Sequence, residues 1–462
     1  MRAAIQFASV AILARLITQD DFGLVTMSLA IVGIATVLGD FGLSMASIQS
    51  QTINQLQRSN LFWTNALVGL VLFAVTLAAA PLIAAFYGRS ELTLITAALA
   101  VTFLLNALAA QFRAEVSRQL RFRWLAAADV GSAFLGLVAA VVLAIGGAGY
   151  WALVAQQIAV ALVSLVVVIL GAQWLPGLPR RGQDMRSFYV FGANTLGVQL
   201  LNYVTANFDS IIIGRVWGAA PLGIYDRAFR LFRLPLQQIA SPMTKVAMPV
   251  LSRLQDDSAR YEAYLLRAQT LLGYCFGGAF LLLAAVSDPL ISLLLGPGWE
   301  EAKPIFAILA IGGVFQGLGY VYYWVFLSRA LTGLQLRWSL ITRSFTLLLM
   351  VVGVIWGPVG VAAAATTGLA LNWIVLSVFP MKKTGVARSP LIIAALRPVA
   401  FLAPMAAILF VLSYRVLTDL SPWLELPVLL ACALTYVAAG CLIPAIRADY
   451  AAVWGVLRHL KR

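Results

Sequence analysis

Long apolar segments recur through almost the whole sequence, and they restrict the folds that it can adopt. Fourteen such runs follow one another, separated by shorter and more polar connections. A helix needs about 20 apolar residues to cross a bilayer, and it satisfies its backbone hydrogen bonds within one segment. Hydrophobic residues make up 62% of the chain and charged residues only 11%. The sequence therefore predicts an all-α polytopic membrane protein with about fourteen transmembrane helices.

The basic residues fit this topology. They concentrate in alternate connections and in the C-terminal tail, which predicts that both termini are cytoplasmic. The formal charge of +14 is therefore explained without a nucleic acid partner. The predicted spans are residues 3–18, 23–47, 60–86, 92–112, 124–146, 150–173, 187–214, 221–250, 263–287, 303–327, 337–356, 359–380, 391–414 and 425–446.

Cysteine and histidine usage argues against a metal or redox site. Cys275, Cys432 and Cys441 all lie in apolar spans, where a thiol behaves as a small hydrophobic group. They have no metal-ligand or redox spacing. The only histidine, His459, lies in the predicted cytoplasmic tail, so we expect no histidine-based catalysis within the membrane.

The two halves of the chain share short motifs at a nearly constant offset. Arg15 and Gly23 match Arg215 and Gly223, and the segment PLIAAFYG matches PLISLLLG about two hundred residues later. Six spans in each half make the repeats parallel, related by an axis along the membrane normal. Such an architecture places a substrate site between the halves.

The repeat suggests how the chain is divided. We expect an N-lobe at residues 1–173, a C-lobe at 184–380, and two further helices with a basic tail at 391–462. The first span is short beside its counterpart, so we expect the true start to lie roughly ten to thirty residues upstream, to give a full span. A cleaved signal peptide is the alternative, although no small-residue cleavage site follows the first run.

A polar stripe runs along the span predicted at residues 221–250. On a helix with 100° per residue, its members follow one another at steps of three or four: Asp226, Arg230, Arg233, Gln237, Ser241 and Thr244. Arg227 lies off the centre of this stripe, so we expect its long side chain to reach the outer membrane interface.

Two further spans have polar faces. Gln199, Asn202 and Asp209 share one face of the span at 187–214, and Asp40 lies on a polar face of the span at 23–47. An ion that faces hydrocarbon costs a few kcal/mol. Together the stripes therefore predict a water-filled cavity between the two halves.

We expect this cavity to bind an anion, because guanidinium groups pair well with phosphate or carboxylate oxygens. Asp40 and Asp209 are the candidates for coupling to a proton or a sodium ion, and no other cofactor or metal is expected. The alternative interpretation is that the arginines pair with Asp226 and Asp209 and hold two helices together. The candidate substrate-binding residues are Arg230, Arg233, Arg343, Gln237, Asn202 and Gln199.

Three other segments have two interpretations each. Tyr320 and the segment 322–324 supply aromatic rings that stack on sugars or form an interfacial belt. The basic segments 111–124 and 453–462 are predicted to lie on the anionic inner leaflet, and partner recruitment is the second interpretation.

Several segments resemble those of the Wzx-like polysaccharide flippases of the multidrug/oligosaccharidyl-lipid/polysaccharide exporter superfamily, in the branch typified by the colanic acid exporter. They are ILARLITQDDFGLVTMSLAI, GDFG, AAQFRAEVSRQLRF, DSIIIGRVWGAAPLGIYDRAFRLFRLPLQQI and SRLQDD. The resemblance implies a MATE/MurJ-like fold of two six-helix lobes plus two C-terminal helices, with alternating access to a central cavity. It also implies export of polyprenyl-diphosphate-linked oligosaccharides across a bacterial inner membrane, in contact with a polysaccharide polymerase or export machinery.

Two other functions are weighed against this one. A multidrug cation extruder of the same fold is disfavoured by the basic stripe. A membrane polysaccharide polymerase or ligase typically has a long extracytoplasmic loop with catalytic groups. The longest outer loop here, residues 288–302, is short and has no histidine.

Overall fold

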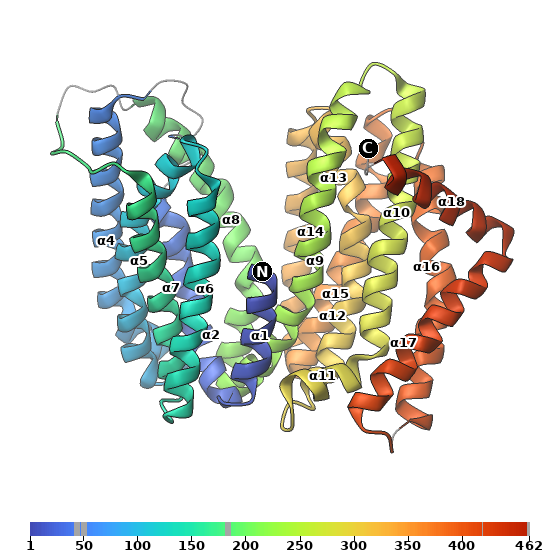
Figure 1. The fold of residues 1–462 in the computed structure, drawn as a ribbon, viewed down its shortest axis with the longest axis horizontal. Helices are drawn as coiled ribbons and strands as arrows, with labels where there is room; N and C mark the ends of the chain where they lie inside the picture. Colours follow the sequence, from blue (N-terminus) through green and yellow to red (C-terminus); the bar gives the residue numbers. More distant parts are fainter. Residues whose placement is uncertain (41–46, 48–52, 181–185, 418, 460–462) are drawn as a thin grey trace. The chain divides into compact units, whose positions relative to one another are not determined.

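The structure is a computed structural model that describes residues 1–40, 47, 53–180, 186–417 and 419–459. Within these ranges all regular secondary structure is helical (Figure 1), which confirms the predicted all-α class. Nine segments of the described chain are long and apolar enough to cross a membrane. One of them, Thr332–Lys383, contains two consecutive helices. Each predicted span overlaps at least one described helix, although α1 ends at Ala14, before the predicted end of the first span, and part of the span at 23–47 lies outside the described residues.

The chain divides into two compact units, Met1–Asp226 and Arg227–Arg462. The division falls inside one continuous helix, α9 (Ala219–Arg253). The lobe boundaries predicted at residues 173 and 184 remain predictions. The other helices of the first unit are α1 (Arg2–Ala14), α2 (Gln19–Asp40), α4 (Gln55–Tyr87), α5 (Glu91–Arg118), α6 (Phe122–Ile145), α7 (Tyr150–Ala172) and α8 (Arg186–Trp217).

The second unit contains the rest of α9 and the helices that follow it. A π-helical turn at Leu412–Val416 ends the first of the two C-terminal spans. The helices are α10 (Ser258–Ala285), α11 (Ser287–Leu295), α12 (Ala302–Leu318), α13 (Tyr320–Ser328), α14 (Thr332–Gly353), α15 (Gly357–Val378), α16 (Arg388–Val411), α17 (Pro422–Ala439) and α18 (Pro444–His459).

Helix α4 shows how local sequence sets the helix ends. Asn54 and Gln57 form a capping box, in which the backbone N–H of Gln57 donates to Asn54 Oδ1 (2.7 Å) and that of Asn54 donates to Gln57 Oε1 (3.1 Å). The helix ends at Gly88, whose φ of 71° is favourable only without a Cβ. Gly296 occupies the matching place in the second PLI motif and ends α11 with a φ of 86°. The glycine of the repeated motif therefore ends a helix with a positive φ in both halves.

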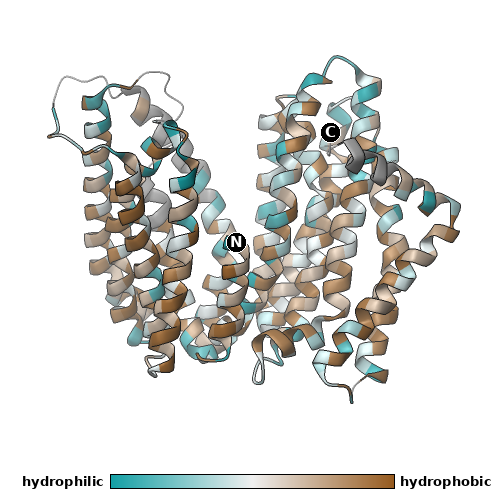
Figure 2. Ribbon diagram, viewed as in Figure 1, coloured by the Kyte–Doolittle hydropathy of each residue, from teal (hydrophilic) through white to brown (hydrophobic). Residues whose placement is uncertain are grey.

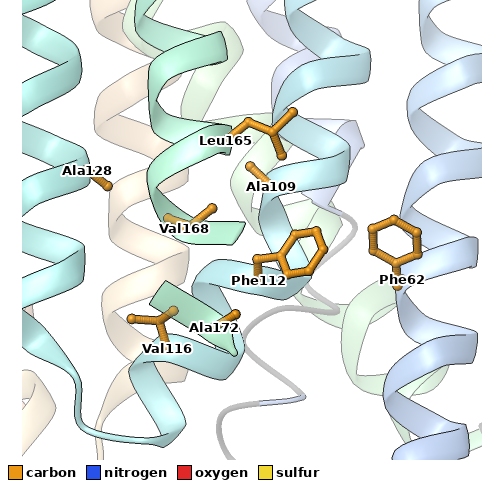
Figure 3. Close-up of a cluster of buried hydrophobic side chains, with 8 residues drawn as sticks. All are labelled: Phe62, Ala109, Phe112, Val116, Ala128, Leu165, Val168 and Ala172. Carbon is orange, nitrogen blue, oxygen red and sulfur yellow. The ribbon is translucent and has the colours of Figure 1, made fainter. Parts of the chain in front are cut away.

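Apolar side chains form both the cores and the outer surfaces. Figure 2 shows hydrophobic colouring along most of the length of α4 to α7. In the first unit, the aromatic rings of Phe62 on α4 and Phe112 on α5 lie 5.5 Å apart. They belong to a buried cluster from α4, α5, α6 and α7 (Figure 3). Leu82 is 71% exposed on the same α4 helix, as expected for a face that meets lipid.

The end of α5 contradicts the prediction of a membrane-surface position for the first part of segment 111–124, and the prediction for residues 119–124 stays a prediction. Gln111 and Glu115 are buried, and a guanidinium nitrogen of Arg58 donates to Glu115 Oε1 at 2.7 Å. Gln119 Nε2 donates to the same oxygen at 2.7 Å. This part of the segment therefore joins α5 to α4 inside the first unit. The side chains of 452–462 lie outside the described residues, so the prediction for the tail stays a prediction.

Helix α2 crosses the start of α9 at two glycines. A Cβ on Gly23 would lie 1.8 Å from the carbonyl oxygen of Ala219. A Cβ on Gly223 would lie 2.0 Å from the carbonyl oxygen of Gln19. No side chain fits in either place, so the two backbones meet directly.

Candidate functional site

Arg230 and Arg233 lie on the exposed face of α9, as predicted. The opposite face of the helix supplies the apolar contacts: Phe232 is buried, and its ring lies 5.6 Å from that of Phe280 on α10. The guanidinium carbon of Arg233 lies 5.6 Å from the ring centre of Phe229, within range of a cation–π contact. Packing of the apolar face therefore fixes which way the arginines point.

Gln237 continues the exposed face one turn beyond Arg233. Three prolines, Pro235, Pro242 and Pro249, lie inside α9. Each lacks an N–H group, so one carbonyl in the preceding turn loses its usual donor. The structure thus brings Arg230, Arg233 and Gln237 together on one polar surface of this helix.

The burial of Arg227 contradicts the prediction that its side chain reaches the outer membrane interface. Its side chain is 5% exposed, and its neighbour Asp226 is 8% exposed. Arg227 therefore does not reach out to a membrane interface. The helical wheel gave the correct face for Arg230 and Arg233 but contained no information on which neighbours cover the first turns of α9.

The polar face of α8 is divided between exposed and buried residues. Gln199 and Asn202 are exposed. Further along the helix, Asp209 is 4% exposed and accepts a hydrogen bond from the phenol of Tyr225 at 2.8 Å. It also accepts from the backbone N–H of Ser210 at 2.8 Å. These contacts make Asp209 part of the packing between α8 and the start of α9, and its predicted role in ion coupling remains a prediction.

The remaining candidate site residues, Arg343 and Asp40, lie on helices other than α8 and α9. Arg343 is exposed on α14, beside Thr342, whose hydroxyl donates to Asn372 Oδ1 of α15 at 2.8 Å. Asp40 is the last residue of α2, and its side chain lies outside the described residues. Among the residues that the structure describes, no group of three or more His, Cys, Asp or Glu side chains could hold a metal ion.

The aromatic segment at 320–324 does not form a sugar-stacking surface. Tyr322 and Trp324 are each 1% exposed, and Tyr320 stacks on Phe276 with ring centres 6.0 Å apart. Only Tyr323 of the four presents a large exposed area, at 38%. The proposed sugar contact is therefore wrong for the two buried rings, which pack inside the second unit.

Sequence reasoning missed one member of the α9 surface. Thr244 belongs to the polar stripe that the sequence predicts, but its hydroxyl accepts a hydrogen bond at 3.0 Å from the indole N–H of buried Trp324. The next residue, Lys245, is exposed instead. The four-residue step from Ser241 to Lys245 could have identified it from the sequence.

Comparisons with known proteins agree with this fold. A family model described as polysaccharide biosynthesis protein matches residues 12–304. The teichuronic acid biosynthesis protein TuaB of Bacillus subtilis (strain 168) is 28% identical over 340 residues, which cover 72% of this chain and 70% of TuaB. The lipopolysaccharide biosynthesis protein WzxC of Escherichia coli (strain K12) is 26% identical over 381 residues, which cover 80% of this chain and 76% of WzxC.

A solved structure has the same fold. The lipid II flippase MurJ, in an inward closed conformation, is similar with a TM-score of 0.75. The similarity covers 95% of this chain and 97% of MurJ at 12% sequence identity. At this identity the likeness shows the fold alone, and it agrees with the MATE/MurJ-like architecture predicted from the sequence.

Proposed function

Because the chain belongs to the family of polysaccharide biosynthesis proteins, we propose that it is a lipid flippase. Its substrate is a polyprenyl-diphosphate-linked oligosaccharide, which it moves by alternating access from the cytoplasmic to the extracytoplasmic leaflet for surface polysaccharide biosynthesis. The names of its relatives TuaB and WzxC, which refer to teichuronic acid and lipopolysaccharide biosynthesis, support this assignment. The MurJ-like fold is consistent with this proposal.

The observation that carries the proposal is the exposed pair Arg230 and Arg233 on α9. An arginine that faces hydrocarbon is costly, so the pair is explained if it faces water and an anionic substrate. A guanidinium group binds two phosphate oxygens at once, which suits a diphosphate. Gln237, one turn further on, adds an amide for hydrogen bonds to the same molecule.

The electrical gradient favours the proposed direction of movement. A diphosphate has about two negative charges, and moving each across 100 mV of potential is worth about 2.3 kcal/mol. In a bacterial cytoplasmic membrane, negative inside, this drives the head group outward. The arginines reduce its desolvation cost. Proton or sodium coupling through Asp40 or Asp209 adds to this drive where it occurs.

The alternatives fit the described residues less well. A multidrug cation extruder of the same fold would place a cationic substrate against Arg230 and Arg233. For a polysaccharide polymerase or ligase, the long outer loop is missing: α11 occupies residues 287–295 of the predicted loop, and α12 begins at Ala302. We also propose that both termini are cytoplasmic and that a polysaccharide polymerase or export complex takes up the product.

The test is a flip assay in proteoliposomes with a fluorescent polyprenyl-diphosphate oligosaccharide. The double variant Arg230→Ala/Arg233→Ala is compared with wild type at matched reconstitution and thermal stability. The control is Arg260→Ala, because this side chain is 80% exposed and pairs only across one turn with Asp257. Loss of flipping in the double variant alone supports the proposal. A wild-type protein that does not flip the lipid overturns it.

A further inference from the structure

The exposed face of α9 extends well beyond the arginines. Ser241 and Lys245 are exposed and follow Gln237 at steps of four residues. On the buried side, Leu236, Ala240 and Ala247 continue the apolar contacts. The polar face therefore continues along α9 from Arg230 to Lys245, within an arc of about 120° on the helix.

A hydrogen bond fixes the rotation of α9 at Lys245. The indole N–H of Trp324 donates to Thr244 Oγ1 at 3.0 Å, and Trp324 is 1% exposed on α13. Successive residues on a helix point about 100° apart. With Thr244 held against α13, Lys245 is turned away from this contact and toward the exposed face.

Lys245 lies in the last third of α9, toward its C-terminal end. Helix α9 ends at Arg253, eight residues later, which is about 12 Å along the helix axis. The whole helix is 35 residues long, about 52 Å, which exceeds the hydrocarbon core of about 30 Å, so Lys245 lies near the edge of that core when α9 is centred in it. A lysine side chain at this position reaches water, where its ammonium group meets an anionic head group before that group enters the membrane.

The positive charges on this face form two separate groups. Arg233 and Lys245 are twelve residues apart, which is about 18 Å along the axis. Between them the exposed side chains are the neutral Gln237, Gln238, Ser241 and Pro242. Pro242 has no N–H group to donate to the carbonyl of Gln238, which adds an acceptor to this neutral stretch.

We propose that Lys245 is a second anion-binding position, which receives the diphosphate before it reaches Arg230 and Arg233. This inference rests on the proposed flippase function and on the cytoplasmic placement of the α9 C-terminus. A lysine ammonium group is a point charge without the fixed geometry of guanidinium, which suits a brief first contact. The neutral stretch then lets the head group move on from Lys245, because it offers no positive charge that would bind the diphosphate tightly between the two groups.

The experiment measures the initial flip rate as a function of lipid-linked oligosaccharide concentration. For Lys245→Gln, we expect the half-saturating concentration to rise about tenfold, as for loss of one charge-assisted contact, with a maximal rate close to that of wild type. Lys245→Arg keeps the charge and is expected to retain near wild-type values. The control Arg260→Gln removes an exposed charge outside α9.

Two results overturn the inference. One is a Lys245→Gln curve that matches Arg260→Gln while wild type flips normally, which leaves the flippase function intact. The other comes from acetylation footprinting of wild-type protein, which needs no variant to fold. We expect substrate to protect Lys245 but not the exposed Lys382 and Lys383. Equal modification of Lys245 with and without substrate contradicts the proposal. Absence of flipping by wild type overturns the proposed function itself.

Discussion

Gly23 and Gly223 lie in a reciprocal contact, in which each glycine packs against the backbone carbonyl of the residue four positions before the other glycine. Gly23 lies against the carbonyl of Ala219, and Gly223 lies against the carbonyl of Gln19. The two glycines are 200 positions apart, and so are Gln19 and Ala219. Each contact thus has a counterpart in which both residues are replaced by their repeat equivalents, which is the pattern that a two-fold axis produces. The internal repeat is therefore visible as local symmetry where α2 crosses α9.

Alanine at either glycine is expected to destabilise the protein. The added methyl group would overlap a backbone oxygen, which only a shift of a helix can relieve, at a cost of about 1–3 kcal/mol. Thermal unfolding in detergent measures the effect. Gly131→Ala is the matched control, because a Cβ at Gly131 has nothing within 4 Å. Equal unfolding temperatures for all three variants would contradict the close crossing. In the double variant the losses should not add, because both substitutions force apart the same two helices.

Glu115→Gln is expected to lower stability sharply, because it leaves Arg58 without its carboxylate partner. Breaking a buried ion pair from one side costs about 3 kcal/mol or more, and Glu115 has a side chain only 6% exposed. The measurement is the same unfolding assay, with the exposed Glu301→Gln as control. If Glu115→Gln and Glu301→Gln unfold at the same temperature, the ion pair between Glu115 and Arg58 does not stabilise this end of α5.

Tyr225→Phe tests the bond to Asp209. The substitution keeps the ring and removes a buried hydroxyl that donates to the carboxylate at 2.8 Å, so we expect a loss of about 1–2 kcal/mol. Tyr414→Phe, at a side chain 63% exposed, is the control. An unchanged unfolding temperature for Tyr225→Phe would show that Asp209 does not depend on this phenol.

Membrane potential is expected to accelerate flipping. With potassium and valinomycin, a potential that is negative on the cytoplasmic side should raise the initial rate of outward movement severalfold. The drive is about 2.3 kcal/mol per charge for each 100 mV. Reversing the potential should slow the same step. A rate that is identical at both polarities would mean that the diphosphate charge does not cross the field in the limiting step.

Cysteine labelling tests the proposed orientation. In a variant without Cys275, Cys432 and Cys441, a single cysteine at Arg260 should react with an impermeant reagent only from the cytoplasmic side. A single cysteine at Glu301 should react only from the outside. Both positions are exposed in the structure. Labelling of both from the same side would reject the predicted topology.

The sequence predicted most of the helices because a bilayer leaves few alternatives. Apolar length located the nine segments of the described chain that are long and apolar enough to cross a membrane, and helical periodicity placed Arg230, Arg233 and Gln237 on one face. Periodicity did not reveal the burial of Arg227, because a helical wheel does not show which neighbours cover each turn. Composition also misplaced the first part of segment 111–124, which is buried within α5, whereas residues 122–124 are exposed. The partner that buries Glu115 is Arg58, 57 positions earlier in the chain, and a local pattern does not contain such a contact.

The polar face of α9 also bears on how the protein is made. Neither α8 nor α9 is among the described segments apolar enough to cross a membrane by length and composition. During biosynthesis such helices gain little by entering lipid alone, so the insertion machinery must retain them until partners such as α10 have emerged from the ribosome. The polar residues that we propose bind the substrate therefore delay the membrane insertion of α9, the helix that carries them. We expect truncated nascent chains that end shortly after Arg253 to be extracted from membranes more easily than chains that include α10.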